Sequence, residues 1–144
     1  MFNRPVQGVV LRQMDTEPSR VVIPHRTTKD LERQLQVCDF ILDPVYDPSV
    51  ALYQSTFTMR VCEHETYAKY VLFSVKDTSD CEDNNVTRSL NSDSVWKGDI
   101  LVLKTHPSNV HILTPIVDDE EINHLASHVS YMQPHVYSST HTNM

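Results

Sequence analysis

The most regular alternation of hydrophobic and polar residues lies in 92–115, SDSVWKGDILVLKTHPSNVHILTP. Its ILVL run (100–103) places apolar side chains on both faces of a strand, which is typical of a strand covered on both sides. The turn sequence THPSN separates this run from a second apolar segment, VHILTP, and the two are predicted to pair as a hairpin that carries the core. Gly98 precedes the first strand, where a glycine can adopt the positive φ that other residues avoid.

A first helix is predicted over 28–41. Apolar residues recur there at steps of four, three and four, which is the helical period: Leu31, Leu35, Cys38 and Leu42. Thr27 and Asp30 have the spacing of a capping box, which marks the start of a helix, and Asp43-Pro44 ends it.

A second helix is predicted over 118–129. Its apolar stripe consists of Ile122, Leu125 and Val129. Four acidic residues occupy 118–121, and negative charge at a helix start is stabilised by the helix dipole.

Further strands are predicted over 20–24, 55–62 and 68–75. Residues 55–62 alternate in polarity, and residues 68–75 are rich in β-branched and aromatic side chains, as strands are. Helical steps also fit Met59, Cys62 or Glu63, Tyr67 and Tyr70, so a helix in this region stays open as an alternative.

The remaining segments are polar. Residues 1–18 are predicted to be a loosely ordered N-terminus, 77–93 a long mobile polar loop and 130–144 a flexible tail. The order of elements then indicates a single α+β domain over 19–129, in which a small antiparallel sheet has two helices packed on one face.

Composition and charge remove several classes of function. The only two glycines, Gly8 and Gly98, lie far apart, so no glycine-rich phosphate cradle can form and no cofactor is expected. The net charge is −7 and the Lys and Arg residues are scattered, which argues against a nucleic-acid partner. No apolar run suits a signal peptide or a membrane span, and three cysteines do not make a disulfide framework. We therefore expect an intracellular protein, cytoplasmic or nuclear, with no membrane partner.

Histidine is the most unusual residue type, with eight in the chain. On the second predicted helix, Glu121, His124 and His128 are spaced i, i+3 and i+7 and so share one face. Imidazole and carboxylate groups at this spacing can chelate a transition metal. A metal site at these three residues is one hypothesis, and a solvated helix face that leads into a polar tail is the other.

Two further residues carry candidate functions. Cys62 and His64 would share a face of a strand, but a thiol enzyme also needs an orienting third group and an oxyanion hole, and neither is visible. A thiol enzyme centred on Cys62 is therefore the weakest hypothesis, and no catalytic residue is predicted. Trp96, the only tryptophan, is either a core residue beside the hairpin or an exposed anchor for a partner.

The segment VWKGDILVLK, followed by a turn, a second strand and the acidic DDEEINHL, resembles the C-terminal segment of a group of uncharacterised fungal proteins. That group shares a W-[KR]-G-[DN] motif before a hydrophobic strand, and the resemblance covers residues 94–125. No activity is attached to the group, so the resemblance implies a folded module with a recurring core and assigns no functional residue.

A small soluble module without catalytic activity, with a structural role or a protein partner of unknown identity, is the function that these patterns favour. A metal-binding protein that uses the C-terminal histidines is the second hypothesis.

Overall fold

The computed structural model describes residues 6–23, 52–60, 67–75 and 78–134. The predicted helix over 28–41 lies outside the described residues, as do Cys62 and His64.

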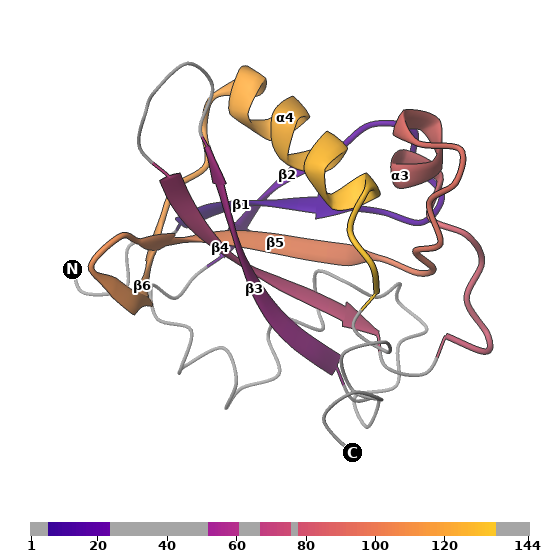
Figure 1. The fold of residues 1–144 in the computed structure, drawn as a ribbon, viewed down its shortest axis with the longest axis horizontal. Helices are drawn as coiled ribbons and strands as arrows, with labels where there is room; N and C mark the ends of the chain where they lie inside the picture. The colour runs from indigo at the N-terminus through magenta and orange to yellow at the C-terminus, as the bar shows by residue number, and fades with distance from the viewer. Residues whose placement is uncertain (1–5, 24–51, 61–66, 76–77, 135–144) are drawn as a thin grey trace.

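Within the described residues, six antiparallel strands form one sheet (Figure 1). Five of them follow the order β2 (Ser19–Ile23), β1 (Val6–Leu11), β5 (Ile100–His106), β4 (Tyr67–Val75) and β3 (Leu52–Arg60). The sixth strand, β6 (Asn109–Thr114), pairs with β5. In the part of the chain that the structure describes, the sheet and two helices confirm a mixed α+β fold in which the sheet dominates.

Strand β5 is the centre of the sheet. One of its edges pairs with β4 over 100–105. Its other edge is divided, because β1 pairs with residues 100–102 and β6 pairs with residues 104–106. The register of β6 shifts between Thr105 and His106. All four side chains of the ILVL run are buried, which confirms the prediction of a central strand covered on both faces.

The sheet buries apolar side chains on both faces. Along β1, β4 and β5, successive side chains point to opposite faces and so belong to two separate clusters. The first cluster includes Val9, Leu11, Tyr70, Leu72, Ile100 and Val102. The second includes Val10, Val71, Phe73, Leu101, Leu103 and Leu113.

Two helices, α3 (Asn85–Leu90) and α4 (Asp119–Ser130), cover the first cluster and lie on the same side of the sheet (Figure 1). Helix α4 begins after Asp118, whose carboxylate accepts a hydrogen bond from the backbone N–H of Glu120. It buries the predicted stripe of Ile122, Leu125 and Val129. The helix predicted over 118–129 is therefore present, with 118 as its N-cap.

The predicted loop over 77–93 contains α3 and is not a structureless segment. The Asn84 side chain accepts from Thr87 N–H as the N-cap and donates to the carbonyls of Leu11 and Gly98, at 2.8 and 2.7 Å. Val86 and Thr87 are fully buried. One buried polar side chain therefore ties this segment to β1 and to the approach to β5, which a count of polar residues does not show.

Within the segment 1–18 that was predicted to be loosely ordered, residues 6–11 instead form β1 inside the sheet. Val9, Val10 and Leu11 are fully buried. The sheet therefore includes residues that precede the predicted domain boundary of 19. The run GVVL (8–11) resembles ILVL, because its successive apolar side chains are buried on both faces of the sheet.

Gly98 has φ of +78° and is the residue from which the chain turns into β5. A Cβ atom at this position would lie 3.1 Å from the sulfur of Cys81. The turn predicted before the first strand of the hairpin is thus a turn that needs glycine, for its backbone angle and for space.

Candidate binding site on the last helix

A row of side chains crosses the sheet beneath α4. Phe57 of β3 is paired with Tyr70 of β4, and Tyr70 is paired with Lys104 of β5. Because these residues are in register, their side chains stand side by side on one face of the sheet. That face is the one that α4 covers, so the row meets the helix.

Glu121 projects from the first turn of α4 onto this row and is 5% exposed. Tyr70 donates its hydroxyl hydrogen to Oε2 of Glu121 over 2.5 Å, and Nζ of Lys104 lies 2.9 Å from the same oxygen. Removing a carboxylate from water is costly unless it is paired and hydrogen-bonded, and here it is both. This triad of Tyr70, Lys104 and Glu121 joins α4 to the sheet.

His128 is held in place further along the helix by an aromatic stack. The ring of Phe57 lies 5.2 Å from the ring of Tyr70, with an angle of 18° between their planes. The other stacking partner of Phe57 is the imidazole of His128, at 5.1 Å and 17°. The orientation of the His128 ring is therefore fixed against β3.

The pKa of His128 is lowered from its ordinary value. Partial burial of the imidazole is the main cause, because it disfavours the charged form, and the neighbouring imidazole of His124 lowers the pKa further. This shift favours the uncharged form of the His128 ring.

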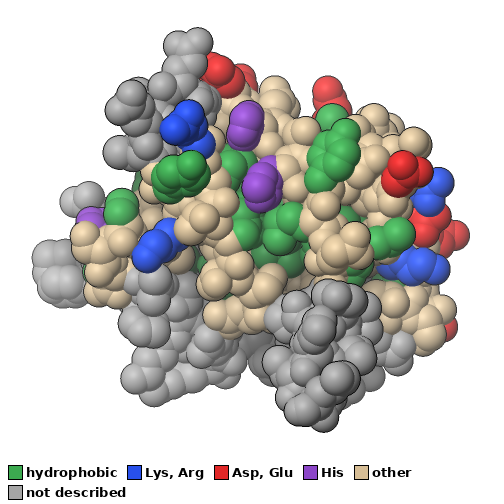
Figure 2. All heavy atoms as spheres, viewed as in Figure 1, with side chains coloured by type: hydrophobic (Ala, Val, Ile, Leu, Met, Phe, Trp, Pro, Cys, Tyr) green, Lys and Arg blue, Asp and Glu red, His purple; other side chains and the backbone are tan. Residues whose placement is uncertain are grey.

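An open hollow of about 320 Å³ lies along the C-terminal half of α4; we call it the α4 hollow. It is lined by His124, Ser127, His128, Tyr131 and Met132. Met132 also packs against the core cluster beneath the helix. Figure 2 shows histidine and hydrophobic side chains together near the middle of the face that carries the helices.

The ends of α3 and α4 meet beside this hollow. Asn91 donates its side-chain N–H to the carbonyl of Ser130 over 3.0 Å. Three large apolar side chains on residues that adjoin this junction are exposed. They are Leu90 (43%), Val95 (55%) and Tyr131 (69%), and we call them the α3–α4 surface.

Trp96 does not belong to that surface. It is 2% exposed and donates its indole N–H to the carbonyl of Val129 over 2.8 Å. The hypothesis of an exposed anchor at Trp96 is therefore wrong. The large apolar ring fills the space between α4 and the sheet, and its single donor adds a second partner to a carbonyl that also accepts the backbone N–H of Met132 just past the helix end.

The structure separates the three predicted metal ligands. Glu121 is directed to Tyr70 and Lys104, whereas His124 and His128 line the α4 hollow. Within residues 6–23, 52–60, 67–75 and 78–134, no group of three or more His, Cys, Asp and Glu side chains is placed to hold a metal ion. All three residues lie on α4 as predicted, but the Glu121 carboxylate is bound to Tyr70 and Lys104 and does not face the two histidines' hollow.

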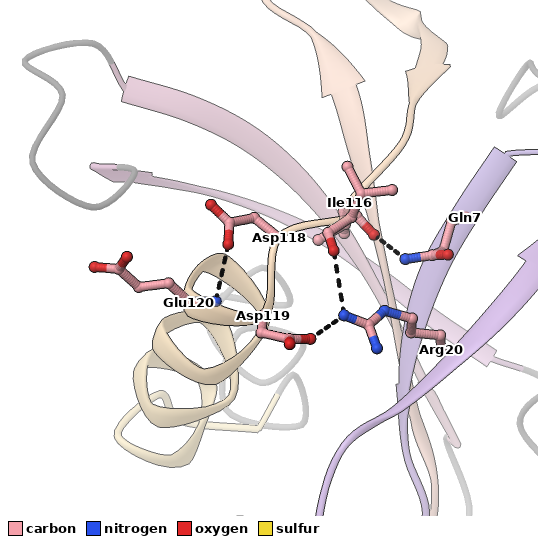
Figure 3. Close-up of polar contacts among 7 residues, drawn as sticks. Gln7, Arg20, Ile116, Asp118, Asp119 and Glu120 are labelled. Atoms are coloured by element: carbon pink, nitrogen blue, oxygen red, sulfur yellow. Dashed lines mark hydrogen bonds and ion pairs between the residues drawn. The ribbon is translucent and has the colours of Figure 1, made fainter.

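A second polar cluster anchors the start of α4 to the other end of the sheet (Figure 3). The backbone carbonyl of Gln7 in β1 accepts from the backbone N–H of Ile116, and the side-chain amide of Gln7 donates to the carbonyl of Ile116. Arg20 of β2 donates to the carbonyl of Val117 over 3.2 Å and forms an ion pair with Asp119. These contacts join the β6–α4 connection to the sheet edge, and their role is structural.

Sequence reasoning missed Phe57, Tyr131 and Met132 as neighbours of the histidines. Met132 follows His128 by four residues, as His128 follows His124, so the spacing was a usable signal. Phe57 is far away in the chain, and only the pairing of β3 with β4 brings it to the helix.

No family model, no curated protein and no solved structure was found to match this chain. Within the part of the chain that the structure describes, no helix is long and apolar enough to cross a membrane.

Proposed function

We propose that the protein is a non-enzymatic interaction module that binds a partner protein through the α3–α4 surface. The observation that carries this proposal is that exposed Leu90, Val95 and Tyr131 each directly adjoin a residue that is hydrogen-bonded across one helix junction. Exposed apolar residues that are scattered singly need no explanation, but a group of them is typical of an interaction site.

The composition of this region supports the proposal. Tyrosine and methionine are enriched in protein–protein interfaces, and Tyr131 and Met132 are adjacent where the surface meets the α4 hollow. An aromatic side chain with a polar tip provides a large contact area together with one hydrogen-bonding group. We expect the partner to present an apolar side chain that fits beside Tyr131.

The junction itself is rigid, which favours binding without reorganisation. The Asn91–Ser130 and Trp96–Val129 hydrogen bonds fix the end of α4 against α3 and against the segment before β5. A surface that is already ordered loses less conformational entropy when a partner binds.

The test compares two double variants of the tagged chain. Each variant is expressed in cells that naturally make the protein and is then purified through its tag. The Leu90→Ser/Tyr131→Ser variant alters the proposed surface. The control, Val22→Ser/Val117→Ser, removes two equally exposed apolar side chains near the β2 edge. We expect proteins that co-purify with the wild type to be retained by the control and lost from the surface variant. Recovery of the same proteins with both variants, or of none with the wild type, would contradict the proposal.

A further inference from the structure

We propose that His124, His128 and Met132 form a binding site for monovalent copper, Cu(I). All three side chains line the α4 hollow. His124 and His128 are four residues apart on α4 and so lie one above the other on its surface, and Met132 follows two residues after the end of the helix. Met132 stays on this side because its backbone N–H bonds to the carbonyl of Val129 over 2.9 Å, which continues the helical turn past Ser130.

The ligand atoms of the two histidines are available. Among the described residues, neither the His124 nor the His128 side chain forms a hydrogen bond or an ion pair. The stack on Phe57 fixes the plane of the His128 ring, which leaves its nitrogen edge free to bind. Holding a ligand in one orientation before the metal arrives increases affinity, because less freedom is lost on binding.

The ligand types favour Cu(I) over other metals. A thioether is a soft ligand that selects Cu(I), and imidazole is also suited to copper. Among the described residues, no carboxylate or thiolate lines the hollow, and Glu121, on the same helix face, is bound to Tyr70 and Lys104. Zinc, which in structural sites takes four nitrogen, sulfur or carboxylate ligands, is therefore poorly served. A cation at the C-terminal half of α4 is also favoured by the helix dipole.

The experiment uses the full chain and Ag⁺, a redox-inert substitute for Cu(I), in calorimetric titrations at pH 7. The ε-methyl groups of the methionines are followed by NMR in the same samples. We expect one tight Ag⁺ site per chain and a shift of the Met132 methyl resonance. Met132→Leu keeps the apolar volume but removes the sulfur, and His128→Leu removes the central imidazole. Each should weaken binding roughly a hundredfold, since even a change beside a metal ligand typically costs about 10–100-fold.

Matched controls separate this site from loose binding by other residues. Met14→Leu changes an exposed methionine elsewhere, and the His135→Ala/His141→Ala double variant changes the two histidines that follow the described residues. Both variants should bind Ag⁺ as tightly as the wild type does. In a separate titration of the wild type, we expect Zn²⁺ to bind far more weakly than Ag⁺. If the Met132 methyl does not shift, or if Met132→Leu binds as the wild type does, the proposed site does not exist.

Discussion

The hydroxyl of Tyr70 and the carboxylate of Glu121 meet over 2.5 Å beneath α4, although 51 residues separate them in the chain. Tyr70 has no exposed surface and Glu121 has 5%. With Lys104 at the same oxygen, the hydrogen bond and the ion pair together secure one helix to two adjacent strands. Three of our predictions about stability test contacts of this kind, in which a buried polar group or a tight turn fixes the fold.

Tyr70→Phe should lower the free energy of unfolding by about 1.5–3 kcal/mol, the range for a hydrogen bond to a charged group. Glu121→Ala should cost more, about 3–5 kcal/mol, because it leaves the Lys104 ammonium partly buried without its partner. Urea unfolding of both single variants and the double variant gives the coupling energy. Equal effects of Glu121→Ala alone and in the Tyr70→Phe background would show that the two groups act independently.

Asn84→Asp keeps the oxygen that caps α3 but removes the N–H donors to Leu11 and Gly98. Each carbonyl left without a donor in a buried site costs about 1–3 kcal/mol, and the introduced charge adds to this. The neighbouring Asn85→Asp is the control, since Asn85 is exposed in the first turn of α3. Thermal melting should show a large loss of stability for the first variant and little change for the second.

Limited proteolysis gives an independent measurement of the same segment. Because α3 is bonded to β1 and to Gly98, we expect cleavage within 84–91 to be slow in the wild type and fast in Asn84→Asp. Rapid cleavage at α3 in the wild type would instead favour the mobile loop that the sequence predicted.

Gly98→Ala should destabilise the fold by about 1–2 kcal/mol from the left-handed backbone angle alone. The new methyl group would also approach the Cys81 sulfur at 3.1 Å. Adding Cys81→Ala should recover the part that is due to this contact and leave the part that is due to the backbone. Chemical denaturation of the single and double variants separates the two, and a Gly98→Ala variant as stable as the wild type would contradict the assigned φ.

Leu101→Ala should cost about 2–5 kcal/mol, as expected for a large cavity in a core, because Leu101 is fully buried on the central strand. The control is Ile112→Ala on β6, where the side chain is 40% exposed. Urea unfolding should show a far smaller loss for the control. Similar losses for both variants would mean that β5 is not the centre of the core.

Acid should destabilise the fold in part through His128. Its pKa in the folded state lies below the ordinary value of about 6.5 that the unfolded chain has. Between these two values the unfolded state binds more protons, so stability falls as the pH is lowered through this window and levels off below the folded pKa. His128→Phe, which retains an aromatic ring beside Phe57, should reduce this dependence on pH.

The control for the pH experiment is His106→Asn on the exposed end of β5, where the amide oxygen can still accept the hydrogen bond from Ser108. Urea unfolding at several pH values between 5 and 7.5 measures all three proteins. The slope in the window should be smaller for His128→Phe and unchanged for His106→Asn.

Local patterns in the sequence were sufficient where one element supplies both the signal and the contact. The run 100–103 shows by itself that two faces are apolar, and the spacing of Ile122, Leu125 and Val129 is helical without reference to anything else. The glycine at 98 was recognised for the same reason, since its backbone angle is a local requirement. These predictions are confirmed by the structure.

The sequence was insufficient where a partner comes from a distant element. Asn84 looks like any residue of a polar loop until Leu11 and Gly98 are placed beside it. Glu121 has the spacing of a metal ligand, but Tyr70 and Lys104, which are supplied by two strands, determine its use. Trp96 is chemically suited to both the core and a surface, and only the position of Val129 decides between them.

The division of one edge of β5 between β1 and β6 has a consequence for the order of events during biosynthesis. The strand β1, residues 6–11, has its inner partner at 100–102, far later in the chain. A nascent chain therefore holds the apolar side chains of β1 without their inner neighbours until residues 100–102 have been translated. Contacts between segments so far apart in the chain form slowly. Until then the β1–β2 hairpin has an unpaired strand edge. We expect a chaperone or an aggregating chain to bind the nascent protein at this stage.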